Sequence, residues 1–124
     1  MPVTYQIDAD AGMMFVVSVG ESTQLERLET MQAWISDPTF RPGLHTLCDL
    51  SAATSTPTLE ELRELVIFVK RNAAAIGKTK LAMVSAAPIT FGVARQFQAL
   101  SHSGPLRVQV FRDRGLALAW LREG

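Results

Sequence analysis

The sequence is poor in the residue types that build metal-centred or disulfide chemistry. Cys48 is the one cysteine among 124 residues, and there are two histidines, His45 and His102, without metal-ligand spacing. A single thiol allows neither a disulfide within the chain nor a cysteine-based metal cluster. The sequence therefore predicts a protein of a reducing compartment, which we take to be the cytoplasm, with no metal site and no cofactor.

An excess of one charge and a long apolar run are also absent. The chain has 12 basic and 12 acidic residues, so no long-range field attracts it to phosphate backbones or anionic lipid. Its apolar runs, such as Met13 to Val17, are far shorter than the roughly 20 residues that span a bilayer. The first residues lack the basic-then-apolar order of a signal peptide. We expect neither nucleic-acid binding nor a transmembrane segment.

Catalytic motifs are missing too. No serine lies in a Gly-x-Ser-x-Gly elbow, and Gly12, Gly20 and Gly92 form neither a dinucleotide fingerprint nor a P-loop. His45 and Cys48 fall on opposite faces of an expected strand, so they are not placed to act as a nucleophile and its base. We expect a protein that is not an enzyme.

The residues that are present predict one α/β domain over residues 1–124. Apolar residues make up 48% of the chain and charged residues 19%, which is typical of a globular protein. Alternating or continuous apolar character predicts five strands, namely Val3–Asp8, Met13–Val19, Leu44–Leu50, Lys80–Ser85 and Leu106–Phe111. The short turn after Asp8 predicts that the first two strands form an antiparallel hairpin.

Four intervening stretches have the spacing of amphipathic helices. Capping boxes at Thr23–Glu26 and Thr58–Glu61 predict the first two helix starts, Pro88 the third, and Asp113 the last. The second helix is expected to reach about Ile76. The expected core-facing residues are Leu25, Leu28, Met31 and Ile35, then Leu59, Leu62, Val66, Val69, Ala73 and Ile76, then Ile89, Val93, Phe97 and Leu100, then Leu116, Trp120 and Leu121. The order β-β-α-β-α-β-α-β-α predicts a mostly parallel five-stranded sheet with an antiparallel N-terminal strand.

Three stretches carry a family resemblance: Leu47-Cys48-Asp49-Leu50-Ser51, Phe91-Gly92-Val93-Ala94-Arg95, and Val110-Phe111-Arg112-Asp113 followed by Ala117-Leu118-Ala119-Trp120-Leu121. Together with the element order, they resemble the SpoIIAA-like (STAS-type) family of small stand-alone bacterial proteins, and more distantly the Sec14-type lipid-transfer domains. The resemblance implies a SpoIIAA-like fold, and protein interaction more often than catalysis.

In the anti-sigma-factor antagonists of that family, a partner kinase phosphorylates a serine or threonine at the helix that follows the third strand. The corresponding place here is at or beside Thr58, so the resemblance makes Thr58 a candidate phospho-switch. The run Ser55-Thr56-Pro57-Thr58-Leu59 differs from the Asp-Ser-Ser-Gly-like run of those proteins. The alternative is that Thr58 acts as an N-cap alone, which contributes on the order of 1 kcal/mol.

Two further sets of residues are candidate sites. Asp49 and Ser51 lie at the carboxyl end of a strand, where α/β sheets usually bind ligands; alternatively, Asp49 fixes its loop by accepting the N–H of Ser51. Ile67, Phe68 and Phe91 lie away from the expected core faces. These three form either an interface with a second copy or a partner protein, or extra core packing.

Two functions from different classes remain open. The first is a regulatory protein-interaction module, a homodimer, for which we expect no enclosed cavity. The second is a small carrier of a lipid-like or other apolar ligand, by analogy with the Sec14-type domains, although this chain has no residues to spare for the additional helices with which those domains enclose lipid.

Overall fold

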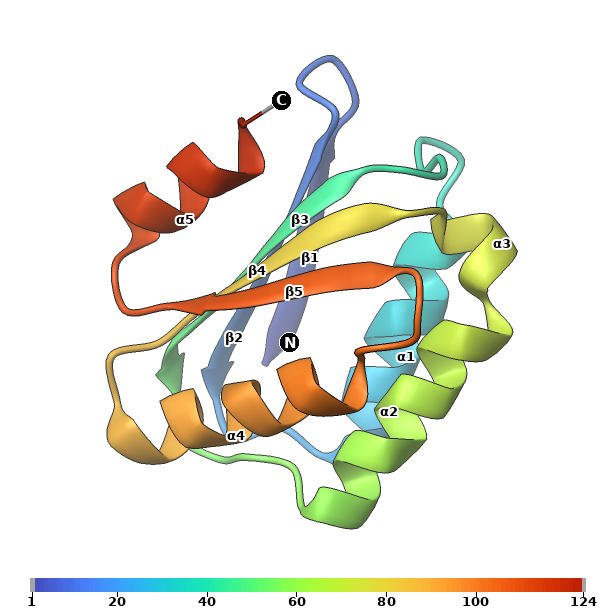
Figure 1. Cartoon of the computed structure of the whole chain (residues 1–124). Helices are drawn as coiled ribbons and strands as arrows, with labels where there is room; N and C mark the ends of the chain where they lie inside the picture. The colour runs from blue at the N-terminus through green and yellow to red at the C-terminus, as the bar shows by residue number, and fades with distance from the viewer. Residues whose placement is uncertain (1, 124) are drawn as a thin grey trace.

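The strands form one sheet whose spatial order, β1-β2-β3-β4-β5, follows the order along the chain (Figure 1). A computed structural model of the protein describes residues 2–123. The strands are β1 (Val3–Asp8), β2 (Met13–Gly20), β3 (His45–Ala53), β4 (Thr79–Val84) and β5 (Leu106–Phe111). β1 pairs with β2 in antiparallel fashion, and the other neighbours are parallel. The predicted fold class is confirmed.

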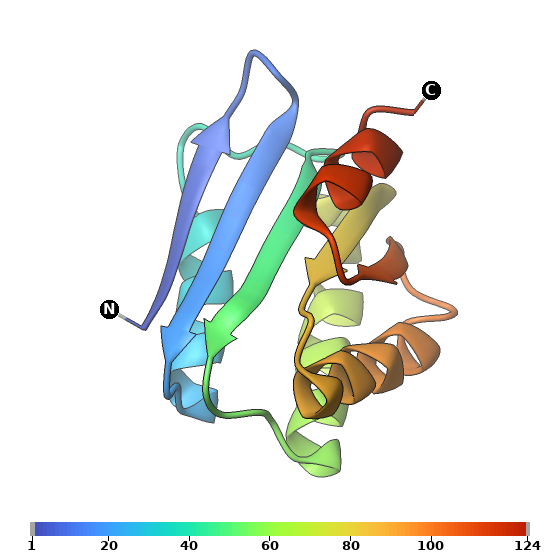
Figure 2. The same ribbon diagram turned by 90° about the vertical axis from the view of Figure 1, so that its left-hand side faces the viewer.

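The helices lie on both faces of this sheet. They are α1 (Gln24–Ile35), α2 (Leu59–Arg71), α3 (Ala73–Ile76), α4 (Pro88–Leu100) and α5 (Arg114–Leu121). Figures 1 and 2 show α1, α2 and α4 on one face and α5 on the other. Both predicted capping boxes are present: the hydroxyls of Thr23 and Thr58 each accept the N–H of the glutamate three residues later, whose carboxylate accepts the threonine N–H.

The second predicted helix is interrupted at Asn72, so the expectation that it continues to Ile76 is wrong. The Asn72 backbone leaves the helical region, with φ −107° and ψ 22°. Its side-chain amide donates to the carbonyl oxygen of Phe68 over 2.8 Å, and this bond competes with the helical pattern. The last turn, Ala73–Ile76, therefore forms the separate helix α3.

The face beneath α5 is tightly packed. Leu47, Ala82 and Ala117 are fully buried there, and Trp120 is buried beside them. The Lys80 ammonium donates to the carbonyl oxygens of Trp120 (2.9 Å) and Glu123 (3.1 Å). These bonds satisfy carbonyls that the end of a helix leaves free, and they hold α5 against the sheet.

The expected core faces are wrong at the first turn of every long helix. Leu25, Ile89 and Leu116 are 66%, 76% and 64% exposed, and Leu59 is exposed as well. The helices begin at the edge where the parallel strands end, and their first turns extend beyond the sheet. The buried side chains are Thr90, Ala94 and Phe97 on α4, and Ala117, Trp120 and Leu121 on α5.

Candidate functional site

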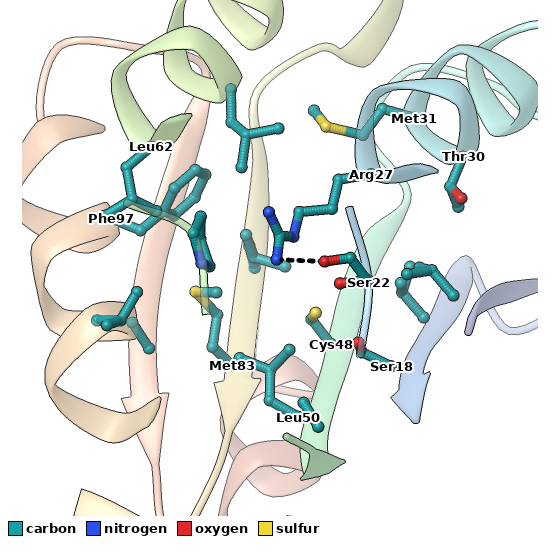
Figure 3. A pocket seen from close by; sticks show the side chains of 18 of the residues that line it. Ser18, Ser22, Arg27, Thr30, Met31, Cys48, Leu50, Leu62, Met83 and Phe97 are labelled. Atoms are coloured by element: carbon teal, nitrogen blue, oxygen red, sulfur yellow. Dashed lines mark hydrogen bonds between the residues drawn. The ribbon is translucent and has the colours of Figure 1, made fainter. Parts of the chain in front are cut away.

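An apolar cavity of about 200 Å³ lies between the sheet and the helices α1, α2 and α4 (Figure 3). Its sheet side consists of alternate residues of the central strands, among them Cys48 and Leu50 of β3 and Met83 of β4. These side chains are half-buried, and the surface they retain faces the cavity. This space is partly open to the surface, so the expectation of no enclosed cavity, tied to the interaction-module interpretation, stays a prediction.

The side of α1 that lines the cavity differs from the predicted stripe. Arg27, Thr30, Met31 and Trp34 line it, and they follow the i, i+3, i+4, i+7 spacing of one helix face. The predicted stripe, which consists of Leu25, Leu28, Met31 and Ile35, is the more apolar face. The missed signal was a second face at helical spacing that combines an arginine and a threonine with two large apolar residues.

Polar contacts join the first turns of α1 and α2 at one end of the cavity. The side-chain amide of Gln24 donates to the Glu61 carbonyl oxygen (3.0 Å) and to the Glu64 carboxylate (2.9 Å). In the loops before these helices, the N–H of Ser22 donates to the Ser55 hydroxyl over 2.9 Å. The two helices are thus connected here through polar bonds, while apolar side chains line the space behind them.

Arg27 is the one charged residue among the residues that line the cavity. Its side chain is 13% exposed, and in Figure 3 the guanidinium extends from α1 toward the sheet. It donates to the carbonyl oxygen of Ser22 (3.0 Å) and the side-chain oxygen of Gln24 (3.3 Å). Burial lowers the pKa of the guanidinium, and the nearby carboxylates of Glu61 and Glu26 partly offset that shift. Arginine stays charged at any physiological pH.

Cys48 also faces the cavity, from the middle of β3. Its removal from bulk water, with a smaller effect from the charge of Asp49, raises the pKa of the thiol to about 12. Because the thiolate is the reactive form of cysteine, this side chain behaves as a small apolar group at neutral pH. Cys48 therefore contributes a small apolar surface to the cavity and no reactive group.

Thr58 lies at the N-terminus of α2, two residues after Thr56, which lines the cavity. The Thr58 hydroxyl accepts the N–H of Glu61 (3.1 Å), and the Glu61 carboxylate accepts the N–H of Thr58 (2.9 Å). The N-cap role is therefore present. Thr58 is exposed, and its phosphorylation stays a prediction.

Asp49 makes the loop-fixing bond that the sequence led us to expect, because its carboxylate accepts the N–H of Ser51 over 2.9 Å. It also accepts from the Arg114 guanidinium over 3.3 Å. The register with β2 shifts at this point: Val17 pairs with Asp49, whereas Val19 pairs with Ala52. Asp49 thus holds the strand beside this irregularity. A ligand role for Asp49 and Ser51 stays a prediction.

The candidate interface residues lie on α2 and α4. Ile67 is 48% exposed, whereas Phe68 and Phe91 are half-buried. The Arg112 guanidinium covers the ring of Phe91, 4.0 Å from its centroid. An interface through these three residues stays a prediction.

A different group of apolar side chains is more exposed than the expected patch. Val19, Leu25, Leu59, Ile89 and Leu116 are all exposed. Val19 lies at the end of β2, and the other four lie in the first turns of α1, α2, α4 and α5. Because β2 to β5 are parallel, all five residues lie at the same edge of the sheet. Four of them, Leu25, Leu59, Ile89 and Leu116, are core residues in the prediction from sequence, which therefore missed this edge.

His45 lies outside the cavity and takes part in a local hydrogen-bond network. Its Nδ1 accepts the N–H of Lys80 over 3.2 Å, while the Thr79 hydroxyl donates to the carbonyl oxygen of Leu44. Burial, and then the charge of Lys80, lower the pKa of His45. Within residues 2–123, no three histidine, cysteine, aspartate or glutamate side chains gather closely enough to hold a metal ion. None of the helices in the same range has the length and hydropathy needed to cross a bilayer.

Comparison with known proteins shows the fold. No family model matches the chain, and no curated protein matches it. A similar solved structure is that of an uncharacterised protein from the DUF3478 family with a SpoIIAA-like fold, from Shewanella loihica PV-4. The two proteins share 15% sequence identity with a TM-score of 0.64, and the match covers 96% of this chain and 91% of that chain. The chain therefore has a SpoIIAA-like fold, as its sequence predicted.

Proposed function

We propose that this domain binds a small apolar ligand in the cavity beneath α1, α2 and α4, in a non-catalytic role. The observation that carries this proposal is a cavity of about 200 Å³ whose lining residues are mostly apolar. Protein interiors are packed as densely as organic crystals, with few voids larger than a water molecule. An apolar pocket of this size in a small domain is therefore a candidate site for a ligand.

Energetics support a bound ligand. The lining is mostly apolar, and each Å² of apolar surface that a ligand removes from water is worth roughly 25 cal/mol. Water is a poor occupant, because a buried water needs two to four polar partners. An apolar molecule restores the missing dispersion contacts without that requirement.

Two measurements test the proposal. Native mass spectrometry of freshly purified protein is expected to show a mass above that of the chain. Protein refolded from urea, which has released its ligand, is expected to bind 1-octanol with shifts of the amide resonances of Cys48 and Met83. Ala82 lies on the packed face beneath α5 and serves as the internal control, because its resonance is expected to stay unchanged. A clean chain mass together with no response to the alcohol would refute the proposal.

A second candidate, the regulatory protein-interaction module, is favoured by the exposed apolar side chains at the edge where the helices begin. Leu25 and Ile89 are the two most exposed of them. Exposed apolar groups at one edge are typical of a contact surface. This candidate function includes a partner protein, a homodimer, a phospho-switch at Thr58 and a location in the cytoplasm.

The double variant Leu25→Gln with Ile89→Gln tests this second candidate. Both residues are exposed, so the fold is expected to persist while self-association in analytical ultracentrifugation weakens. Ile67→Gln makes the matching change in the interface that the sequence predicts through Ile67, Phe68 and Phe91, so it distinguishes that interface from the edge that carries Leu25 and Ile89. If wild type sediments as a monomer at high concentration and neither variant changes its sedimentation, self-association is refuted.

A further inference from the structure

Among residues 2–123, the lining of the cavity contains one charged side chain. Arg27 points inward from α1 among apolar residues. Removing a charge from water is unfavourable unless the charge is paired and hydrogen-bonded. The apolar lining alone therefore does not explain why an arginine side chain lies in this position.

The partners of Arg27 within the protein leave the guanidinium incompletely satisfied. Its two hydrogen bonds go to uncharged acceptors, on Ser22 and Gln24. A guanidinium has five N–H donors, and none of the Arg27 nitrogens is among the fully buried unpaired atoms of residues 2–123, so the donors beyond these two bonds face accessible space. The nearest carboxylate oxygen, Oε1 of Glu61, is 3.9 Å away and already accepts the N–H of Thr58. Glu61 thus supplies charge nearby without a direct hydrogen bond.

We infer that Arg27 binds the anionic head of the cavity ligand, and that the ligand is a small carboxylate with an apolar tail. This inference rests on the proposed function. A carboxylate matches the planar guanidinium and accepts two parallel N–H bonds from it. The apolar lining beyond, formed by residues such as Leu50 and Met83, accommodates the tail.

The size of the cavity sets the length of the tail. An apolar cavity of roughly 150 Å³ accommodates benzene, with its six carbon atoms. On the same scale, about 200 Å³ holds roughly eight carbon atoms. Octanoate, with eight carbon atoms and a terminal carboxylate, is therefore the probe that matches the cavity in both charge and volume.

The test compares three probes of equal chain length on wild-type protein refolded from urea: octanoate, 1-octanol and octylammonium. Isothermal titration calorimetry at pH 7.5 and constant ionic strength is expected to give an affinity for octanoate at least tenfold above that for 1-octanol, with octylammonium the weakest. Equal affinities for octanoate and 1-octanol would overturn the inference while leaving the apolar cavity as a binding site. Absence of binding for all three would overturn the proposed function as well.

Variants then assign the preference to Arg27. Arg27→Gln is expected to reduce octanoate affinity to the level of 1-octanol, whose own affinity changes less than twofold. Arg27→Lys is expected to restore part of the preference. Arg63 is exposed on α2 and is absent from the lining of the cavity, so Arg63→Gln is the charge-matched control and is expected to change nothing. An octanoate preference that survives Arg27→Gln would assign the head group to another residue and refute the inference.

Discussion

Filling the cavity from the sheet side gives the sharpest test of its existence. The change is Cys48→Ile, which adds two heavy atoms to a side chain that faces the cavity. Isoleucine also suits a strand, because β-branched side chains favour extended backbone. Each buried methylene contributes about 0.8 kcal/mol. We therefore expect the free energy of unfolding to rise by about 1.5 kcal/mol and the Tm by about 6 °C.

The matched control is Ala82→Val on the opposite face of the sheet. This change also adds two heavy atoms and a β-branch, but Ala82 is fully buried beneath α5. Ala82 pairs with Leu47, the residue beside Cys48 in β3. Because that face has no free space, overpacking is expected to reduce the free energy of unfolding by about 1–3 kcal/mol. The two substitutions thus each add two heavy atoms and a β-branch on adjacent strands, with opposite expected signs.

Urea unfolding of ligand-free protein measures both values, and titration with octanoate measures binding. Cys48→Ile is expected to weaken octanoate binding at least tenfold, because the added atoms occupy the volume that the tail needs. If Cys48→Ile destabilises the protein as much as Ala82→Val does, the space beside Cys48 is already filled, and the cavity argument fails with it.

Three further predictions follow from the hydrogen bonds and pKa shifts. Thr58→Ala removes the N-cap of α2 and is expected to reduce the free energy of unfolding by about 1 kcal/mol. Thr58→Asp keeps a hydrogen-bond acceptor, so its free energy of unfolding is expected to stay near that of wild type. Equal urea midpoints for wild type and Thr58→Ala would contradict the N-cap role. Folding lowers the pKa of His45 from its ordinary 6.5, so the unfolded chain binds more protons than the folded protein. The free energy of unfolding is therefore expected to fall as the pH decreases from about 6.5 through the lower folded-state pKa. An NMR titration of the His45 imidazole with a midpoint at or above 6.5 would contradict this prediction. Burial raises the pKa of Cys48 to about 12, so its reaction with a thiol-specific disulfide reagent at pH 8 is expected to be much slower in folded protein than in urea. Saturation with octanoate is expected to slow the reaction further. Equal rates in folded protein and in urea would show that the thiol is freely exposed.

The parts of the fold that depend on neighbouring residues were predictable from sequence. The capping box at Thr58 was predictable because its donors and acceptors are three residues apart. The antiparallel pairing of β1 with β2 was predictable because a short turn permits no other arrangement. The bond from Ser51 to Asp49 also spans two residues and was anticipated.

The cavity was not predictable in the same way. Its lining comes from all five strands, from α1, α2, α3 and α4, and from the loops before α1 and α2, so its volume depends on how far apart these elements lie. On α1, the apolar stripe with Leu25 and the mixed face with Arg27 both have helical spacing. Local periodicity cannot choose between them, because the choice is made by packing against the sheet.

The sequence by itself determined the α/β class, the order of the elements, the two capping boxes and the antiparallel start of the sheet, because periodicity, turns and caps act between residues close together in the chain. Only the tertiary structure decided that Arg27 and Cys48 face a common apolar space and that the first turns of the helices expose Leu25, Ile89 and Leu116. The physical reason is that free volume and exposure depend on the distances between elements far apart in the sequence. Those distances are set when the helices pack on the sheet.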